Sequence, residues 1–260
     1  MSGSDIRSAA YGQVPADTTD DVRERESRIA VLPVGSFEQH GPYLPLATDT
    51  LIACAIAGEI AAAYPVHLLP AVTVSCSHEH AAWPGTVSIS STTLHAVVRD
   101  IAASLRRSGV DTLVLVNGHG GNYVLGNVVQ ESSARGEHMA LFPAAEDWET
   151  AREKAGVHTS LLTDMHAGEI ETSILLHTRP ECVRPGYESA DFVADDRRHL
   201  LTVGMSAYTD SGVIGRPSLG SAEKGKALLA SLTESFGAYF VLLTAQETAE
   251  DGAVEDDGAR

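Results

Sequence analysis

Two carboxylates and an imidazole follow the first apolar run of the chain, at residues 29–35. Glu38 and His40 come directly after this run, and Asp49 lies nine residues beyond His40. Residues two apart in an extended segment point to the same side, so Glu38 and His40 can converge on one ligand. Carboxylate oxygens and imidazole nitrogens together suit zinc, manganese or iron. The segment therefore offers three metal ligands, although a Glu-x-His pair alone also fits a polar loop that binds no metal.

A glycine-rich loop with one histidine is the second candidate. The sequence Val116-Asn-Gly-His-Gly-Gly-Asn122 follows the most strand-like run of the chain. Glycines allow the backbone to approach a ligand closely and to donate N–H groups, so Gly120, Gly121 and Asn122 are predicted to contact substrate. The loop lacks the lysine and the hydroxyl residue of a P-loop, and it lacks the order of a GxGxxG motif. His119 at its apex is thus predicted to bind metal, the alternative being a histidine on a tight turn.

Segment 164–173 adds His166, Glu169 and Glu171 at the start of a predicted helix. Residues two apart on a helix point in different directions, so Glu169 and Glu171 cannot both face one site. The helix dipole favours an acid in the first turn, which explains one of the two glutamates without any function. One acid of this pair and His166 remain as candidates for chemistry.

Segment 76–86 is dense in histidine, glutamate and tryptophan. Its His-Glu-His order lacks the helical HExxH spacing of a zinc protease, although His78, Glu79 and His80 are alternative metal ligands. We interpret the segment as the wall of a substrate pocket, with Glu79, His80 and Trp83 in contact with the substrate.

Apolar runs and amphipathic stretches alternate along the chain, which predicts a three-layer α/β/α fold with a mostly parallel sheet. Strands are expected at residues 29–35, 66–74, 110–116 and 138–142, and helices at 51–63, 94–105, 123–135, 169–177 and 228–243. In such a sheet, sites form beyond the carboxyl ends of the strands, where the segments containing Glu38 and His119 both lie.

Composition limits the classes of function and of partner. The 260 residues include 18 Lys and Arg against 35 Asp and Glu, and the net charge of −17 argues against nucleic-acid binding. No uninterrupted apolar run reaches the length of a membrane span, and the first residues lack the order of a signal peptide. With three cysteines that are expected to be reduced, we expect a cytoplasmic protein without a membrane partner. One domain is expected over 28–244, between a polar N-terminal segment, 1–27, and an acidic, disordered tail, 245–260.

Five segments, taken together and in order, resemble the creatininase family of amide hydrolases. They are PVGSFEQHGPYLPLATDT, EHAAWPGTVSIS, LVNGHGGN, HAGEIETS and GVIGRPSLGSAEKGK, and they span about residues 28–243. In this family the matching Glu, His, Asp and loop His bind two metal ions. The resemblance thus implies that Glu38, His40, Asp49 and His119 are ligands, and that Asp49 bridges the two ions.

The sequence departs from creatininase itself in the glycine-rich loop. Creatininase has a further glutamate ligand two residues after the loop histidine, where this chain has Gly121. The wider family suggests Glu171 as the replacement, both as a metal ligand and as a catalytic residue. The departure predicts little activity on creatinine.

The resemblance implies an amidohydrolase that cleaves a non-activated amide, lactam or peptide bond. Two zinc, iron or manganese ions sharing Asp49 would lower the pKa of a bridging water and supply hydroxide near neutral pH. His166 is predicted to give a proton to the leaving nitrogen. The wider family includes formamide hydrolases and a peptidase that matures the ribosomally made precursor of mycofactocin, so the expected substrate is a small amide or a modified peptide. Resemblance alone implies a homo-oligomer, specifically a hexamer.

Two other functions remain open from the residues. A metal-dependent phosphoesterase could use similar ligands, but it would usually recruit Arg or Lys to the phosphate, and the motif segments contain none before Arg216 and Lys224. A metal-binding scaffold without catalysis is the other alternative, and the retention of every other ligand argues against it.

Overall fold

The computed structural model describes residues 14–257, with side chains as far as Ala245, and this part of the chain contains one sheet. Its strands are β1 (Ile29–Val34), β2 (His67–Leu68), β3 (Thr112–Asn117) and β4 (His138–Phe142). They all pair in parallel, in the order β2-β1-β3-β4. The carboxyl ends of β1 and β3 therefore lie side by side, with Val34 opposite Asn117.

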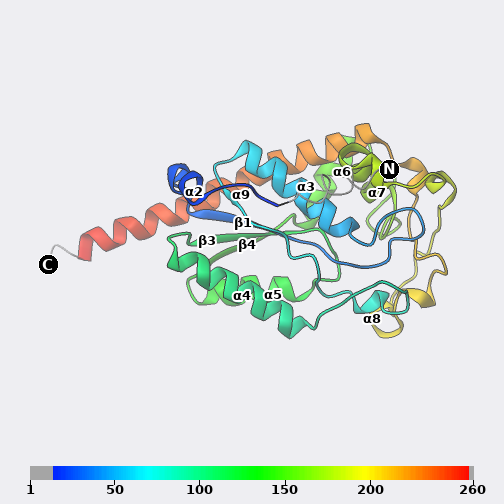
Figure 1. The fold of residues 1–260 in the computed structure, drawn as a ribbon, viewed down its shortest axis with the longest axis horizontal. Coiled ribbons are helices and arrows are strands. Elements are labelled where there is room, and N and C mark those ends of the chain that lie inside the picture. Colours follow the sequence, from blue (N-terminus) through cyan, green and yellow to red (C-terminus); the bar gives the residue numbers. More distant parts are fainter. Residues whose placement is uncertain (1–13, 258–260) are drawn as a thin grey trace.

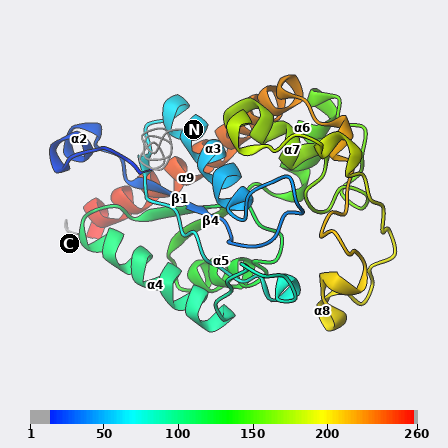
Figure 2. The ribbon, with the colours of Figure 1, turned by 45° about the vertical axis from the view of Figure 1, so that its right-hand side comes forward.

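Helices cover both faces of this sheet (Figures 1 and 2). The helices are α2 (Thr19–Arg25), α3 (Thr48–Ala63), α4 (Ser91–Arg107), α5 (Val124–Ala134), α6 (Ala145–Ala155), α7 (Glu169–Thr178), α8 (Leu200–Val203) and α9 (Ala222–Asp257). Figure 1 shows α3, α6, α7 and α9 above the sheet and α4 and α5 below it. The short helix α8 lies apart from both layers, on the side of the molecule where the carboxyl ends of the strands point.

The alternation of side chains along each strand creates two separate apolar cores. Ile29 and Val31 of β1 pack in a cluster with residues of α3, α7 and α9. The intervening Ala30 and Leu32 pack on the opposite face, with residues of α4 and α5. A parallel strand buried on both faces has no polar side, which is why β1 is a continuous apolar run. The predicted three-layer α/β/α fold with a parallel sheet is thus confirmed.

Segment 66–74 is less regular than the predicted strand, because β2 has only two residues. Pro70 interrupts it, since proline has no N–H to donate to a neighbouring strand. The segment nevertheless follows the edge of β1, where the amides of Leu69 and Val72 donate to the carbonyls of Val31 and Pro33.

Helix α6 was not predicted, because its sequence is highly charged and lacks a broad apolar stripe. Its start is stabilised by Asp147, whose carboxylate accepts a hydrogen bond of 2.8 Å from the amide of Ala144. The helix packs along α9, where the Tyr239 hydroxyl donates to Asp147 at 3.0 Å. Tertiary contacts therefore hold α6 in place.

Both ends of the chain were expected to be polar segments outside the domain. Residues 1–13 of the N-terminal segment and 258–260 of the tail lie outside the described residues. Within 14–27 the structure has the short helix α2. The prediction of disorder over residues 245–257 differs from the structure, in which α9 continues to Asp257. The segment contains three Ala and three Glu, which are good helix formers.

The first part of α9, Ala222–Ala245, is long and apolar enough to cross a membrane, with a mean hydropathy of 1.4. No such stretch was predicted from the sequence. Leu228, Leu232 and Phe236 of this stretch are fully buried against the domain. Packing in the core of the domain accounts for part of the apolar composition of α9, since 33% of its most apolar stretch is buried.

Candidate metal centre

The predicted ligands meet at the carboxyl edge of the sheet, where two loops pack against the start of α3. Glu38 and His40 follow β1, and His119 follows β3. A Cβ atom at Gly35 would lie 2.3 Å from the Cα atom of Thr50, so only glycine allows the first loop to approach α3. The second loop makes a similar contact, because a Cβ atom at Gly118 would lie 2.4 Å from the Asp49 carbonyl oxygen.

Asp49 lies between two histidines, with one carboxylate oxygen facing each. His40 Nε2 is 2.9 Å from Oδ1, and His119 Nδ1 is 2.9 Å from Oδ2. The other ring nitrogen of each histidine donates to a backbone carbonyl, from His40 to Glu38 at 3.1 Å and from His119 to Cys76 at 2.8 Å. Metal-binding histidines are typically held in this way, with one nitrogen fixed by an acceptor and the other free to coordinate.

Glu38 provides an independent indication that the site takes a cation. Its side chain is fully buried, and neither carboxylate oxygen has a hydrogen-bond partner among the described residues. Burial, together with the Asp49 carboxylate, raises the pKa of Glu38 to about 8. A buried carboxylate without donors is costly, whereas a divalent cation would compensate its charge. The residues present therefore fit a bound metal.

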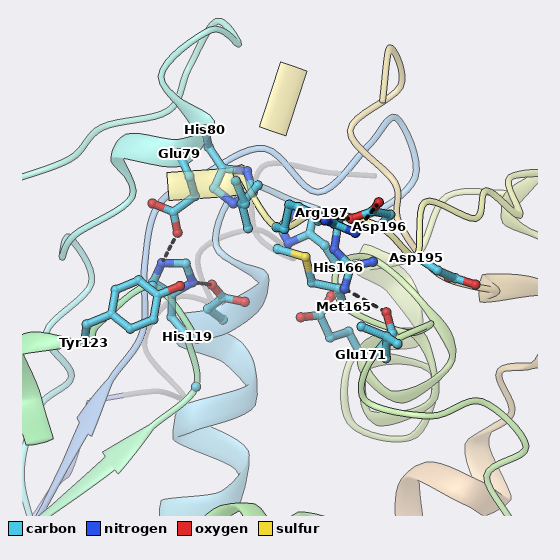
Figure 3. A pocket seen from close by; sticks show the side chains of 17 residues that line it. Glu79, His80, His119, Tyr123, Met165, His166, Glu171, Asp195, Asp196 and Arg197 are labelled. Carbon is cyan, nitrogen blue, oxygen red and sulfur yellow. Dashed lines mark hydrogen bonds and ion pairs between the residues drawn. The ribbon is translucent and has the colours of Figure 1, made fainter. Parts of the chain in front are cut away.

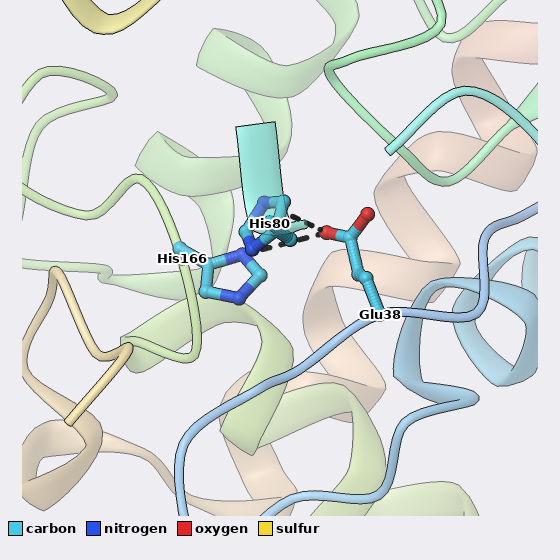
Figure 4. Close-up of side chains that lie close together, drawn as sticks. All are labelled: Glu38, His80 and His166. Atoms are coloured by element: carbon cyan, nitrogen blue, oxygen red, sulfur yellow. Dashed lines mark ion pairs between the residues drawn. The ribbon is translucent and has the colours of Figure 1, made fainter. Parts of the chain in front are cut away.

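Two further histidines face Glu38, as Figure 4 shows. His80 Nε2 lies 3.2 Å and His166 Nδ1 lies 3.8 Å from Glu38 Oε1. The sequence indicated that His80 contacts substrate from the pocket wall. In the structure its ring lines the cavity but also closes on Glu38, and only 1% of the residue is exposed. Its position next to Glu38 was missed, since it depends on how segment 76–86 folds over the first loop.

His166 is held in a neutral form by its surroundings. Burial, together with the nearby rings of His40 and His80, keeps the pKa of His166 well below its usual range. Its Nε2 donates to the Gln39 carbonyl at 2.6 Å, which leaves Nδ1 as the basic nitrogen. To act as the predicted proton donor, this ring must first accept a proton at Nδ1.

The start of α7 directs its two glutamates to opposite sides. Glu171 Oε2 lies 3.8 Å from His40 Nε2 and accepts a hydrogen bond of 2.6 Å from the amide of Ala167. Glu169 instead pairs with Lys224 Nζ at 2.5 Å and accepts from the amide of Thr159 at 3.0 Å. The structure therefore brings Glu171 next to the predicted ligand His40 and turns Glu169 toward Lys224 instead.

A cavity of about 700 Å³ lies over these residues. In Figure 3 Glu79, His119 and Tyr123 form one wall, and Met165, His166 and Glu171 form the facing wall. Loop residues 195–198 complete the lining, which the sequence analysis missed; their only signal was the charged run Asp-Asp-Arg-Arg. A second cavity, of about 580 Å³, shares Glu79, Gly121, Tyr123 and Leu200 with the first.

The predicted substrate contacts fall into two groups. Glu79, His80, Gly120 and Gly121 line the large cavity. Asn122 does not, because its buried side chain donates to Asn117 at 3.0 Å and accepts from the Cys76 amide at 3.2 Å. Its side chain therefore holds the glycine-rich loop, and the contact of Asn122 with substrate stays a prediction.

Trp83 likewise does not line either of the two large cavities in the part of the chain that the structure describes. Trp83 comes three residues after the end of η1 (His78–His80), and its ring centroid lies 6.3 Å from that of His80. Trp83 therefore lies next to His80, and its contact with substrate stays a prediction.

The Glu79 carboxylate fills the space above Gly121. A Cβ atom at residue 121 would lie 2.1 Å from Glu79 Oε1 and 2.4 Å from His119 Nε2. Glu79 Oε1 itself lies 3.4 Å from His119 Nε2. A carboxylate from another segment thus occupies the place where a side chain of the glycine-rich loop would start.

We expect Gly121→Ala to displace Glu79 and turn the His119 ring, lowering metal affinity by about 10- to 100-fold, as for loss of an outer-shell partner. The affinity can be measured by competition with a fluorescent chelator. Gly120→Ala is the matched control, because a Cβ atom at Gly120 would meet nothing within 4 Å. Equal losses in the two variants would contradict the role assigned to the Glu79–Gly121 contact.

Comparisons with known proteins agree with this geometry. The model of the family Creatininase (creatinine amidohydrolase) matches residues 16–240. The chain is 34% identical over 217 residues to a mycofactocin precursor peptide peptidase of Mycobacterium ulcerans, covering 78% of this chain and 81% of that protein. It is 27% identical over 233 residues to the creatinine amidohydrolase of Pseudomonas putida, covering 80% and 88%.

A solved structure described as creatininase with Mn has the same fold. It superposes with a TM-score of 0.72 at 21% identity, covering 86% of this chain and 95% of that one. The family model matches most of the chain, and the histidine and carboxylate donors of a metal site are in place. The chain therefore belongs to the creatininase family, and it is a metal-dependent amidohydrolase, a hydrolase of carbon–nitrogen bonds.

Proposed function

We propose that this protein is a peptidase that uses two metal ions to cleave a peptide bond in a short or modified peptide. The observation that carries the proposal is the pair of cavities of about 700 and 580 Å³, which share one wall beside the metal ligands. Sites for single small ligands occupy about 300–1,000 Å³, so the two together offer room for an extended substrate. The mycofactocin precursor peptidases similar to this chain support the same substrate class.

Two ions are proposed because the donors fall on both sides of Asp49. Glu38 and His119 would hold one ion and His40 and Glu171 the other, with Asp49 shared between them. Nitrogen and oxygen donors suit zinc, manganese or iron. When bound, such ions lower the pKa of a water molecule and polarise a carbonyl group.

The residues of this chain supply the remaining functions. His166, with its basic Nδ1 facing Glu38, would take up the proton that the attacking water loses and return it to the leaving nitrogen as the carbon–nitrogen bond breaks. The backbone of Gly120 and Gly121 borders the cavity and can donate N–H groups to a developing oxyanion. The buried edge of the sheet keeps bulk water away from Glu38 and Asp49.

The phosphoesterase alternative is not favoured by the arginines of the cavity wall. Arg197 donates to the carbonyl of Leu162 at 2.7 Å and also to that of Ala194. Arg198 pairs with Asp196 at 2.9 Å. Both guanidinium groups therefore already have partners within the protein, whereas a phosphate site would need free donors.

The test is an assay of the enzyme loaded in turn with zinc, manganese or iron. Creatinine, a formamide and a panel of peptides are offered side by side, and products are identified by mass spectrometry. We expect peptide cleavage at one position and little turnover of creatinine. Efficient hydrolysis of creatinine or the formamide, with no peptide cleaved, would overturn the proposal.

We also propose that the protein forms a homo-oligomer, and specifically a hexamer by resemblance to the family. Exposed apolar side chains on α9 support association, since Val241 and Leu242 are 67% and 58% exposed. Light scattering at micromolar concentration should then give several times the chain mass of 27.4 kDa. A monomer under these conditions would contradict the proposal.

A further inference from the structure

A smaller cavity of about 220 Å³ adjoins the metal centre. Six residues line both this cavity and the large one: Gly118, His119, Gly120, Met165, His166 and Glu171. Both cavities therefore reach the same proposed ligands, His119 and Glu171, and the same proton-transfer residue, His166. A substrate cleaved at these residues can extend into both.

The walls of the small cavity are mainly apolar. The apolar residues that it does not share with the large cavity are Ile52, Pro143, Trp148, Leu161 and Ile170. Trp148 comes from α6, the helix that the sequence did not predict. One consequence of docking α6 on α9 is that an aromatic ring is placed beside the metal centre.

The polar side chains of the same walls already have partners. Asn117 donates to the His119 carbonyl at 2.8 Å and accepts from Asn122 at 3.0 Å. Asp164 accepts from the amides of Glu169 and Ile170 at 2.6 and 3.0 Å. Of the shared polar side chains, His119 and Glu171 are proposed metal ligands and His166 is the proposed proton-transfer residue. What remains for an occupant is therefore mainly the apolar surface, where a charged group would lose most of its hydration.

We propose that this small cavity is the specificity subsite of the enzyme, and that it binds one uncharged apolar or aromatic side chain of the residue next to the cleaved bond. The inference rests on the proposed peptidase function and names the substrate class more closely. A volume of about 220 Å³ is below the roughly 300 Å³ at which whole-ligand sites begin, so it suits one side chain and no more.

Two adjacent leucines provide matched variants for the test. Leu161 lines the small cavity and Leu162 the large one, and they are 39% and 59% exposed, so both tolerate a polar residue. Peptides that differ only in one residue beside the cleaved bond, Phe or Lys, are compared by kcat/KM. We expect the wild-type enzyme to prefer Phe by at least about tenfold, the least that apolar pocket contacts usually contribute.

Leu161→Asp should abolish or reverse this preference, because it places a carboxylate at the subsite. Leu162→Asp, whatever its effect on the overall rate, should leave the ratio unchanged. Equal ratios in the wild-type enzyme, or equal changes in the two variants, would overturn the assignment of the subsite.

A binding experiment separates this inference from the peptidase proposal. The chain has two tryptophans, so in Trp83→Phe the only remaining one is Trp148, which lines the small cavity. Its fluorescence should change saturably with N-acetylphenylalanine amide, and at least tenfold more weakly in the Leu161→Asp background. N-acetyllysine amide is the control.

A saturable response without hydrolysis of any peptide would retain the apolar subsite and reject the peptidase. Peptide cleavage without a saturable response or a side-chain preference would reject the subsite and retain the peptidase.

Discussion

Replacing Asp49 with alanine is expected to remove both metal ions and to lower kcat/KM by at least about a thousandfold, since members of a catalytic set act as a unit. The Asp49 side chain is 2% exposed, and its two oxygens face His40 and His119 at 2.9 Å each. No other carboxylate among the described residues faces both of these histidines so closely. Elemental analysis and an activity assay of the purified variant measure both effects.

Graded controls make this prediction specific. Ser36→Ala removes the hydroxyl that donates to Asp49 Oδ2 at 2.7 Å, and should reduce metal affinity by only about 10- to 100-fold. Asp111→Ala removes a carboxylate that pairs with Arg28 near the surface, and should leave the metal content unchanged. Full metal occupancy in Asp49→Ala would show that this carboxylate bridges nothing.

Variants of Lys224 and of Glu171 should separate an effect on folding stability from an effect on metal binding. Lys224→Met leaves the Glu169 side chain, which is fully buried, without its cation. Removal of one member of a buried ion pair typically costs about 3–5 kcal/mol of unfolding free energy. We expect this loss in urea unfolding of the metal-free protein, with no change in the number of ions bound after reloading.

Glu171→Gln should have the opposite profile. It removes a carboxylate that faces His40 at 3.8 Å, so one of the two proposed ions should bind at least about 100-fold more weakly. The urea midpoint of the metal-free protein should change little, because Gln can still accept the hydrogen bond from the Ala167 amide. A larger metal loss in Glu169→Gln than in Glu171→Gln would reverse the assignment.

The layers of the fold could be predicted from the sequence because they depend on local patterns. The runs that became β1 and β3 are apolar throughout, as parallel strands buried on both faces must be. Helix α4 has a clear apolar stripe, with Leu94 and Val98 buried. Helix α6 lacks such a pattern and depends on packing against α9, which no local window contains.

The position of the site was predictable for a similar reason, since Glu38 and His119 follow neighbouring strands. The surroundings of the ligands were not. His80 reaches Glu38, and Asn122 turns into the glycine-rich loop, only through contacts between distant segments. The Glu79 carboxylate lies where a Cβ atom of residue 121 would be. This fit depends on distances of tenths of an ångström, which residue spacing does not determine.

The proposed ligands come from chain segments that are far apart in sequence but meet at one edge of the sheet. An ion held by Glu38 and His119, and one held by His40 and Glu171, would therefore each act as a cross-link that closes a long loop of the backbone. If the metal stays bound in the unfolded chain, the link lowers the conformational entropy of that chain. If the metal binds only the folded chain, its binding free energy stabilises the native edge of the sheet. Metal would in this way contribute to the stability of the loops themselves, and chelation should open the catalytic edge before it loosens the core around Phe236.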